Sequence, residues 1–535
     1  MRDHEAIVSS DGIAFAGTFN VAVPFIDRHL DEGRGDKVAV RAVDSPDGPE
    51  VAVTYGELAE AVNLAGNAFA GLDLARGDRI VLVIKDAPEF LYAFWGAIKA
   101  GFVPVPINTL LRARDLAFIF ANSGCAAIVY SPEFASEVIP ALAEARPAPA
   151  YALPVAGDGI TLVSLMEAAS DKLDPVPSSP ADDAFWLYSS GSTGTPKGAV
   201  HAHRDMVVSS QRYGVETIGV GEGDIHLSAA KLFFAYGLGN AMTFPLWTGG
   251  AAVLFGGRPT PDGMIALIER FKPTLYYAVP TLYAAHLHAL DAAAAAPDLA
   301  SLRACVSAGE PLPAPIFERW KDRTGLDILD GIGTTEILHI FISNRPGAVK
   351  PGSSGRLVPG YEARIVADDG STEIATGEIG NLMIRGDSVI SRYWELPEKT
   401  AEALTGNGWI RTGDSYSVDA EGWFTCQGRS DDMLKVGGIW CSPVEIEARL
   451  AAHDAVLEAA IVGRADEDGL IKPEAWVILN DPKAASEALA TALAAFCQEG
   501  LARYKYPRWV QFVEELPKTA TGKIQRFRLR ERQVG

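Results

Sequence analysis

The sequence predicts a mixed α/β protein whose large N-terminal domain holds two α/β subdomains and a small β-barrel, followed by a small, mobile α+β C-terminal domain. Three observations support this fold class. Helical apolar repeats alternate with short apolar runs up to about residue 346, glycines then crowd around short β runs, and helices and strands alternate again after about residue 430. A chain of 535 residues has room for two to four domains. We expect the domains to be residues 1–430 and 431–535.

The first α/β unit begins with a helix. Residues Thr54-Tyr-Gly-Glu57 form a capping-box pattern, and apolar residues recur at helical spacing over 58–72. A short buried strand is expected at 79–84, and a second helix at 89–100 that ends before Gly101, a residue favoured at helix C-termini. Further strands are expected at 102–105 and 125–130, whereas the Ala- and Pro-rich stretch 131–180 predicts peripheral helix and loop. Strands that alternate with helices in this way predict a parallel sheet.

A second α/β unit repeats this alternation. It predicts helices at 264–271, 282–290 and 313–323, and strands at 274–279, 303–307 and 326–329. Seven glycines between 352 and 386 then separate short β runs such as 362–366 and 381–384, which predicts antiparallel β structure in a small barrel. The last block predicts helices at 444–451 and 484–496 with strands at 456–462, 475–479 and 509–513, a size that can fold alone.

Composition excludes several classes of protein. The net charge is −21 and no Lys/Arg-rich block occurs, so a nucleic-acid or membrane-surface partner is not expected. The start lacks the basic and apolar regions of a secretory signal, and no run of 18 apolar residues occurs. The five cysteines are scattered without a C-x-x-C pair, which favours reduced core thiols and no structural zinc. We therefore expect a cytoplasmic protein.

The stretch with the strongest chemical character is Tyr188-Ser-Ser-Gly-Ser-Thr-Gly-Thr-Pro-Lys-Gly198. Glycines let backbone N–H groups turn toward an anion, hydroxyls add donors, and Lys197 adds a positive charge. A flexible surface linker is the alternative, but a linker needs no apolar strand leading into it, as 185–188 does. The spacing differs from the Gly-x4-Gly-Lys-Ser/Thr loop of common NTPases. The residues expected to bind phosphate are Ser189, Ser190, Gly191, Ser192, Thr193, Gly194, Thr195 and Lys197.

This loop resembles the signature of the adenylate-forming superfamily, which includes acyl-CoA synthetases, luciferases and peptide-synthetase adenylation domains. Six further stretches fit the same family, so that the resemblance spans roughly residues 54–530. It implies that Thr335 contacts the α-phosphate of ATP, that Glu336 holds Mg²⁺, and that Asp414 and Arg429 bind the ribose. Taken alone, these stretches could be ordinary turns and solvated carboxylates. The remaining nucleotide-binding residues implied by the resemblance are Ala308, Gly309, Glu310, Pro311, Asp330, Gly331, Ile332, Gly333 and Thr334.

The resemblance also assigns roles to the C-terminal part. Asp431 matches the hinge about which the small domain of the family rotates, and Lys435 belongs to its second catalytic face. Lys523, in Pro517-Lys-Thr-Ala-Thr-Gly-Lys523, matches the catalytic lysine, with Lys518 as the rival position. The alternatives are a plain β-hairpin near 437 and a basic tail near 523. The residues implied to line the coenzyme A tunnel are Gly437, Gly438 and Trp440.

The acyl pocket is implied by the stretch Lys231-Leu-Phe-Phe-Ala-Tyr-Gly-Leu-Gly239, which closely resembles benzoate-CoA ligases, as does Glu336-Ile-Leu-His339. An aromatic, largely apolar slot suits a planar ring. Simple core packing is the alternative for these aromatic residues and for His339. The residues expected to line the pocket are His203, Phe234, Ala235, Tyr236, Gly237 and His339.

The implied reaction joins an aromatic carboxylate, ATP with Mg²⁺, and coenzyme A through an acyl-AMP intermediate, in a monomer or homodimer. Three alternatives stay open. An amino-acid adenylation domain serving a carrier protein would need a carboxylate near 233–236, which the sequence lacks. A nucleotide sensor without chemistry would lose Lys523, Glu336 or Asp414, yet all three are present. A medium-chain fatty acyl-CoA synthetase differs only in the shape of its pocket.

Overall fold

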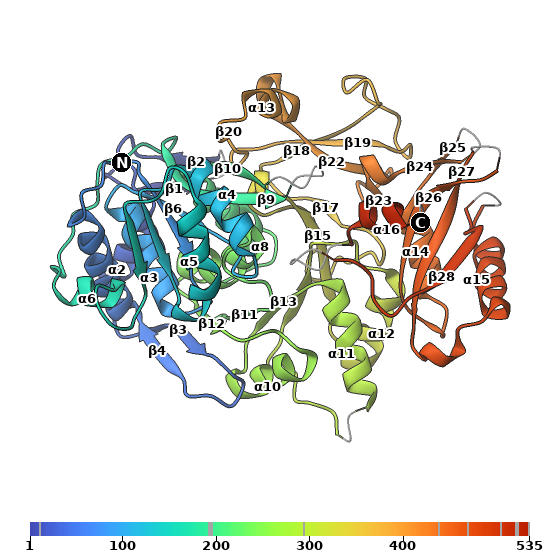
Figure 1. The fold of residues 1–535 in the computed structure, drawn as a ribbon, viewed down its shortest axis with the longest axis horizontal. Coiled ribbons are helices and arrows are strands. Elements are labelled where there is room, and N and C mark those ends of the chain that lie inside the picture. The colour runs from blue at the N-terminus through green and yellow to red at the C-terminus, as the bar shows by residue number, and fades with distance from the viewer. Residues whose placement is uncertain are drawn as a thin grey trace.

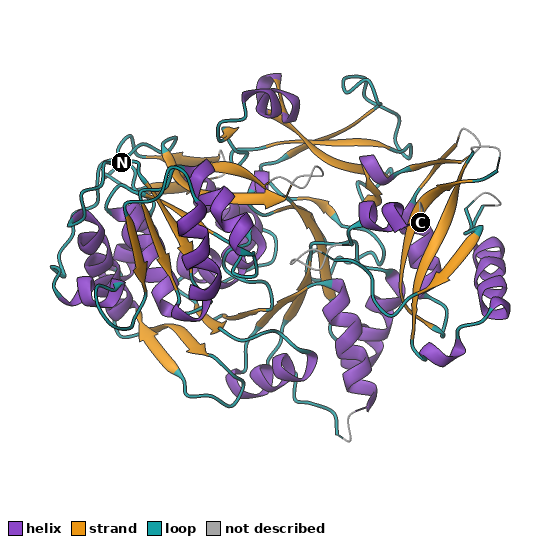
Figure 2. Ribbon diagram, in the orientation of Figure 1, coloured by secondary structure: helices purple, strands orange, loops and turns teal. Residues whose placement is uncertain are grey.

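The computed structural model describes residues 1–9, 12–190, 196–292, 295–436, 439–467, 470–502, 505–518 and 524–532. Figure 1 shows two regions: a large α/β body formed by the N-terminal part, and a smaller region formed by the last hundred residues beside α12. The central sheets of the body lie between helices (Figure 2). This arrangement of a large and a small α/β region is the predicted fold class.

The largest sheet has nine strands in the order β17-β16-β15-β14-β13-β11-β12-β3-β4. Its centre, from β3 to β15, is parallel, and antiparallel strands are added at both edges. In chain order the strands are β3 (Val38–Val43), β4 (Val51–Thr54), β11 (Ile225–Ser228), β12 (Ala251–Phe255), β13 (Leu275–Ala278), β14 (Ala304–Ser307), β15 (Ile328–Gly333), β16 (Ile340–Ser343) and β17 (Arg356–Leu357). The helices that connect them are α7 (His203–Ser209), α8 (Ala235–Leu238), α9 (Phe244–Thr248), α10 (Pro261–Phe271), α11 (Pro280–Ala292) and α12 (Ala314–Thr324).

A second sheet is parallel throughout, with the order β6-β5-β7-β8. It contains β5 (Arg79–Val83), β6 (Val103–Pro106), β7 (Ala127–Tyr130) and β8 (Tyr151–Pro154), with α2 (Tyr55–Ala70), α3 (Pro88–Lys99), α4 (Ala113–Ser123), α5 (Ala135–Glu144) and α6 (Leu162–Glu167) around it. The expected parallel sheet is confirmed, but β8 falls in a stretch predicted to be only helix and loop. This edge strand is short and partly exposed, so it lacks the continuous apolar run of a buried strand.

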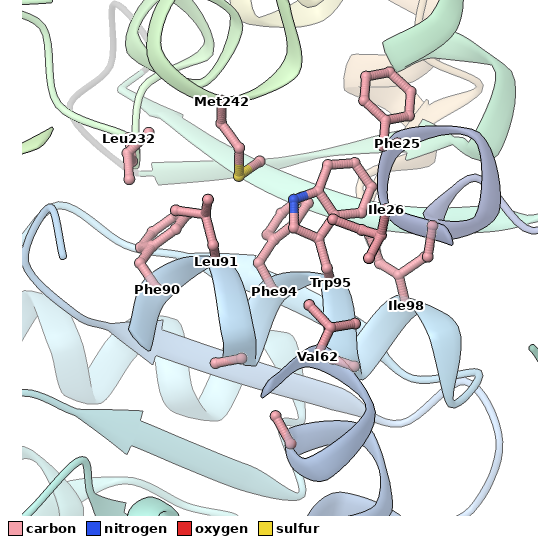
Figure 3. Close-up of a cluster of buried hydrophobic side chains, with 14 of the residues drawn as sticks. Phe25, Ile26, Val62, Phe90, Leu91, Phe94, Trp95, Ile98, Leu232 and Met242 are labelled. Carbon is pink, nitrogen blue, oxygen red and sulfur yellow. The ribbon is translucent and has the colours of Figure 1, made fainter. Parts of the chain in front are cut away.

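Helices α2 and α3 build the core between these layers. The capping box at the start of α2 is complete, because the Thr54 hydroxyl accepts a hydrogen bond from Glu57 N–H and the Glu57 carboxylate accepts one from Thr54 N–H. The two helices approach closely, since a Cβ atom on Gly66 would lie 2.9 Å from the carbonyl oxygen of Gly96. Figure 3 shows aromatic side chains of α3, among them Trp95, pointing toward Met242.

A three-stranded sheet carries the glycine-rich stretch. Strands β9 (Asp183–Ser190) and β10 (Pro196–Ala202) pair antiparallel, and β20 (Arg392–Tyr393) joins the outer edge of β10. The pairing places Ser189 opposite Lys197. The glycine-rich stretch therefore connects two antiparallel strands, and Ser190 at the end of β9 is paired with Pro196 at the start of β10. The small elements nearby are β1 (Ala6–Ser9), β2 (Gly12–Phe15) and α1 (Arg28–Asp31).

The glycine-punctuated region forms a five-stranded antiparallel sheet of β18 (Glu362–Val366), β19 (Gly380–Arg385), β21 (Leu404–Thr405), β22 (Trp409–Val418) and β23 (Phe424–Arg429), with α13 (Pro397–Ala403) beside it. Antiparallel structure is as predicted. The pairing runs β18-β19-β22-β21 with β23 on β22, so the strands form an open sheet and not the expected closed barrel. The pattern of turns predicts antiparallel pairing but says nothing about whether the first and last strands meet.

The C-terminal region has its own core. A three-stranded sheet, β26 (Val456–Ala465), β27 (Ile471–Leu479) and β28 (Trp509–Phe512), packs against α14 (Pro443–Ala451) and α15 (Glu487–Gly500) through a separate cluster of buried apolar side chains. A small hairpin of β24 (Leu434–Val436) and β25 (Ile439–Cys441) precedes it, and α16 (Arg526–Arg532) ends it. A separate core is what an independently folding unit requires.

Candidate active site

The carboxylate of Glu336 lies where three elements meet. Its Oε1 atom accepts hydrogen bonds from the hydroxyl of Ser189, at the end of β9, at 3.1 Å and from the hydroxyl of Tyr393, on β20, at 2.8 Å. Glu336 itself sits in a single 3₁₀ turn, Thr335–Ile337, which follows β15. The structure thus brings together Ser189 and Glu336, which the sequence places in the same site although they are 147 residues apart.

Tyr393 is a site residue that the sequence analysis missed. Its ring lies under the ammonium group of Lys197, with Nζ 4.5 Å from the ring centroid, while its hydroxyl donates to Glu336. Burial and the neighbouring carboxylate both raise the pKa of Tyr393 above its usual value, so the phenol stays a hydrogen-bond donor. Its position depends on the pairing of Ala199 with Tyr393, a contact between distant strands that leaves no local pattern in the sequence.

The turn that carries Glu336 is strained. Leu338, directly after it, has φ +73°, a conformation that non-glycine residues rarely adopt. Two hydrogen bonds from the loop after β19 hold the turn: Ile390 N–H donates to the carbonyl oxygen of Glu336 at 2.9 Å, and the Ser388 hydroxyl donates to that of Ile337 at 2.9 Å. Strained backbone that is held by several neighbours is typical of functional sites.

The predicted ribose-binding pair is formed across two strands. Asp414 on β22 is paired in register with Arg429 on β23, and Nη1 of Arg429 lies 2.9 Å from Oδ1 of Asp414. The Asp414 carboxylate raises the pKa of Arg429, and Glu336 contributes in the same direction. The pair therefore holds a carboxylate and a guanidinium in fixed positions, and the guanidinium is close enough to Glu336 to feel its charge.

The predicted nucleotide-binding residues 308–311 lie at the carboxyl end of β14, next to the parallel strand β15. Residues 308–311 follow β14, and Ser307 of β14 is in register with Asp330 of β15. The carboxyl ends of parallel strands are where α/β folds bind ligands. Asp330 is buried, and burial raises its pKa well above the ordinary value of an aspartate. Its Oδ1 atom has no hydrogen-bond partner among the described residues.

The predicted acyl-pocket segment forms a compact aromatic cluster around His339. The Tyr236 hydroxyl donates to the carbonyl oxygens of Ala278 and Val306, both at 3.2 Å, which fixes the ring of Tyr236. His339 lies with its ring centroid 4.6 Å from that of Phe244, and its Nε2 atom is 3.3 Å from the carbonyl oxygen of Tyr236. The structure therefore brings Tyr236 and His339 together, as the sequence predicts for two residues of one pocket.

His339 is held neutral. Burial lowers its pKa to about 3, and its Nδ1 atom has no partner among the described residues. Gly237 can only be glycine, because a Cβ atom there would lie 2.1 Å from the carbonyl oxygen of Lys231. The segment thus offers an uncharged, tightly packed aromatic surface, which suits a planar apolar ligand.

The structure corrects the placement of His203. The sequence analysis puts this residue beside the acyl segment, but its ring accepts a hydrogen bond from Val21 N–H at 3.1 Å. His203 lines a surface groove with Arg76 and Asp182, and neither Tyr236 nor His339 lines that groove. The reason is that the chain leaves β10 at Ala202 and enters α7 at His203, which turns the side chain toward the N-terminal segment.

Several predicted site residues lie outside the described part of the chain. These are Gly191, Ser192, Thr193, Gly194, Thr195, Gly437, Gly438 and Lys523, together with the side chains of Ser190, Lys435 and Trp440. Lys518, the rival of Lys523, is described: its Nζ atom lies 2.8 Å from Oε2 of Glu458 in the C-terminal region. That contact engages Lys518 in a local ion pair within its own domain.

The predicted hinge residue Asp431 lies in a 3₁₀ turn, Ser430–Asp432, that links β23 to the C-terminal region. Its neighbour Asp432 pairs with two arginines of α16, Arg530 at 2.9 Å and Arg526 at 3.6 Å. Arg526 also forms hydrogen bonds to both carboxylate oxygens of Glu447 on α14. The connection between the two regions is therefore a short turn anchored by ion pairs on its C-terminal side.

The site also fits a divalent cation. No group of three His, Cys, Asp or Glu side chains gathers as a ligand set within the described ranges. A single carboxylate such as that of Glu336 is enough for Mg²⁺, which usually takes one or two carboxylates and completes its shell with substrate phosphates and water.

Among the residues that the structure describes, no helix is both long and apolar enough to cross a membrane.

Comparison with known proteins gives a consistent result. The AMP-binding enzyme family matches residues 27–394, and the AMP-binding enzyme C-terminal domain matches residues 445–523. A benzoate–CoA ligase of Thauera aromatica is 47% identical over 519 residues, which cover 96% of each chain. The crystal structure of the anthranilate CoA ligase AuaEII with anthranoyl-AMP has a TM-score of 0.91 at 40% identity, covering 98% of this chain and 99% of that one. A benzoate CoA ligase structure from Burkholderia xenovorans LB400 has a TM-score of 0.87 at 42% identity, covering 96% and 100%.

Proposed function

We propose that this chain, which belongs to the AMP-binding enzyme family, activates an aromatic carboxylate with ATP and transfers the acyl group to coenzyme A, releasing AMP and pyrophosphate. It is an AMP-forming acid–thiol ligase that uses ATP and coenzyme A as co-substrates. The observation that carries the proposal is the aromatic cluster of Tyr236 and His339, which lies next to the strained turn of Glu336 in a chain that resembles benzoate–CoA ligases over 96% of its length.

In the first step a carboxylate oxygen of the substrate attacks the α-phosphorus of ATP, and pyrophosphate leaves. Two anions must approach each other, so the site has to offset negative charge that grows in the transition state. We assign this role to Lys523, to the backbone N–H groups of residues 189–195 and to Thr335, with Lys197 positioning the phosphates. Glu336 would hold Mg²⁺, which supplies charge neutralisation on the phosphate oxygens when bound.

Ser189 and Tyr393 act on Glu336 in this scheme. Both donate to the same oxygen, Oε1, and so hold the carboxylate in one orientation. Asp414 and Arg429 would bind the ribose hydroxyls, residues 308–311 would form a wall of the adenine pocket, and residues 330–334 would also contact the nucleotide. A fixed carboxylate accepts both hydroxyls of a ribose, which is why Asp suits this position.

In the second step the coenzyme A thiolate attacks the acyl carbon and AMP leaves. The two steps need different groups at the same acyl centre, so we propose that the domain 431–535 rotates relative to 1–430 about Asp431 and turns Lys435, Gly437, Gly438 and Trp440 toward the thiol. The short turn at 430–432 and the separate core of the C-terminal region support this proposal.

Benzoate is the substrate that we propose, with hydroxy- and aminobenzoates as close seconds. The segment of Phe234, Ala235 and Tyr236 carries no carboxylate that could pair with a substrate ammonium, unlike the site required by an amino-acid adenylation domain. His339 is neutral in this environment, so it does not demand a charged ring substituent. The anthranilate CoA ligase is the observation that favours aminobenzoates as an alternative.

A substrate panel tests the proposal. Purified protein is given ATP, Mg²⁺ and coenzyme A with benzoate, 4-hydroxybenzoate, 2-aminobenzoate or octanoate, and AMP release is measured. We expect turnover of at least one of the aromatic acids, benzoate foremost, that depends on both ATP and coenzyme A. Strong turnover of octanoate with none of benzoate would contradict the aromatic assignment and favour a fatty acyl-CoA synthetase.

The proposed role of Mg²⁺ has its own test. Omission of Mg²⁺ with added chelator should stop adenylation.

A cytoplasmic location and a monomeric or homodimeric state are further proposals. The five cysteines are free thiols, four of them buried, which suits a reducing compartment. Size-exclusion chromatography with light scattering would decide between monomer and homodimer.

A further inference from the structure

We propose that His201 is a positioning residue for adenylation: it fixes the backbone of the turn that carries Thr335 and Glu336. This inference rests on the proposed function, since it concerns the same turn. His201 lies on β10, on the C-terminal side of the glycine-rich stretch, and is completely buried. Its side chain connects β10 to a turn that is 134 residues further along the chain.

Two hydrogen bonds define the role of His201. Its Nε2 atom lies 2.8 Å from the carbonyl oxygen of Thr335, and its Nδ1 atom lies 2.9 Å from Oδ2 of Asp205. The ring is also stacked on Phe185, with centroids 5.0 Å apart and an interplanar angle of 14°. The ring is therefore fixed in its plane by Phe185 and at both nitrogens by oxygen atoms.

Both of these oxygens are acceptors. A backbone carbonyl has no proton to give, so the contact with Thr335 requires a proton on Nε2 of His201, while Nδ1 shares a hydrogen bond with Asp205. The side chain of Asp205 is held in place for this contact, because it is buried and its Oδ2 atom also accepts a hydrogen bond from Ala202 N–H at 3.0 Å. The contact with Asp205 thus holds the ring so that its Nε2 atom faces the Thr335 carbonyl.

The turn needs this support because of its own geometry. The carbonyl oxygen of Thr335 accepts only one hydrogen bond from within the turn, from Leu338 N–H at 3.1 Å, and Leu338 is in a strained conformation with φ +73°. The loop after β19 holds Glu336 and Ile337, but His201 is what holds Thr335. Loss of the His201 contact would loosen the peptide between Thr335 and Glu336. We assign Thr335 to the α-phosphate and Glu336 to Mg²⁺.

Core packing alone is the competing explanation. In that case His201 would matter only for filling space beside Phe185 and for satisfying the buried Asp205. Core packing predicts similar effects of two substitutions, whereas the positioning role predicts different ones. His201→Gln can keep a donor at the Thr335 carbonyl but removes the side-chain contact with Asp205. His201→Asn can keep a donor at Asp205 but does not reach Thr335.

The experiment compares these two variants in the two half-reactions. ATP–pyrophosphate exchange with benzoate measures adenylation, and thioester formation from isolated benzoyl-AMP measures the second step. We expect His201→Gln to keep adenylation kcat within about threefold of the wild type, and His201→Asn to lose about tenfold, the usual effect of one hydrogen bond. Both variants should keep the KM for benzoate and the rate of thioester formation within about twofold of wild type. Thermal unfolding of each variant checks that it is folded.

His286→Gln is the matched control. His286 is as deeply buried as His201 and its Nε2 atom lies 2.7 Å from the Tyr276 hydroxyl, but none of its hydrogen bonds reaches a residue assigned to the site. We expect this variant to lower the unfolding temperature without changing adenylation. Equal losses of adenylation in His201→Gln and His201→Asn, or a parallel loss of thioester formation, would overturn the positioning role. A wild-type protein that adenylates no aromatic acid would instead overturn the proposed function.

Discussion

The hydroxyl of Tyr393 donates a hydrogen bond to Oε1 of Glu336 at 2.8 Å, and this contact joins β20 to the strained turn after β15. The same tyrosine ring receives the ammonium group of Lys197 on its face. One side chain therefore connects the carboxylate assigned to Mg²⁺ with the cation assigned to phosphate. Orientation of such groups before the reaction begins is a main source of catalytic power in enzymes that stabilise developing charge.

Tyr393→Phe should therefore slow adenylation. The substitution removes one donor to Glu336 and keeps the ring beneath Lys197, so only the hydrogen bond is lost. We expect kcat/KM for adenylation to fall by about tenfold, or roughly 1.4 kcal/mol, with the KM for benzoate unchanged. Pyrophosphate exchange measures the effect. Tyr276→Phe, which removes a buried hydroxyl that contacts His286, is the control and should change only stability.

Lys523→Ala should abolish acyl-AMP formation while leaving ATP binding measurable. If Lys523 stabilises the charge that spreads over the reacting carboxylate and α-phosphate, its removal costs transition-state energy and not ground-state affinity. We expect a fall of about a hundredfold or more in pyrophosphate exchange. Lys518→Ala is the matched control, because Lys518 is engaged by Glu458 and should be dispensable for adenylation. Full activity of Lys523→Ala would refute the assigned role.

Asp414→Asn should raise the KM for ATP by about tenfold and leave the KM for benzoate unchanged. The amide loses the charge that pairs with Arg429 and one of the acceptor sites that a ribose requires. Initial rates at varied ATP and fixed benzoate give the comparison. Asp419→Asn removes a carboxylate that pairs with Lys350 near the same sheet, and it should change neither constant.

Asp431→Pro should slow thioester formation from isolated acyl-AMP more than it slows adenylation. Proline fixes one backbone torsion of the turn at 430–432, which would have to change if the C-terminal region rotates. The ratio of the two half-reaction rates should fall by about tenfold for this variant. Asp431→Ala keeps the backbone free and should leave the ratio close to that of the wild type. Equal effects on both steps would speak against a hinge at Asp431.

The protein should lose stability as the pH falls from about 7 to about 5. Burial lowers the pKa of His29, His203, His226 and His286 to about 4, and that of His339 to about 3. An unfolded histidine titrates near 6.5, so below this pH the unfolded chain binds protons that the folded protein refuses. Each histidine then destabilises the fold by up to about 1.4 kcal/mol per pH unit.

Thermal unfolding at several pH values measures this dependence. His286→Gln removes one of the five groups, and its unfolding temperature should fall less steeply over the same pH range than that of the wild type. An unfolding temperature that stays constant from about pH 7 to about pH 5 would contradict the neutral, buried state of these histidines.

Much of the fold could be predicted from the sequence because the signals are local. The capping box at Thr54 and Glu57 has the predicted hydrogen bonds, since both partners lie within one turn of helix. Parallel strands, and antiparallel strands after Gly352, follow from runs of apolar residues and turn residues. The sequence could not show that the glycine-punctuated region, residues 352–429, stays an open sheet, because closure into a barrel depends on whether its first and last strands meet.

The sequence by itself determined which residues we assign to the nucleotide site, including Ser189, Glu336, Asp414 and Arg429, because they lie in long, specific motifs that resemble those of the adenylate-forming superfamily. Only the tertiary structure decided how they are held. Tyr393 reaches Glu336 because β20 pairs with β10. On β10, the register shifts between His201 and Ala202 and the chain then enters α7, so His201 supports the site and His203 faces the N-terminal segment. Residues 201 and 203 are two apart, so strict strand alternation would place both histidines on the same face of the sheet. The irregular pairing between His201 and Ala202 separates them, and no residue pattern in the sequence predicts this irregularity.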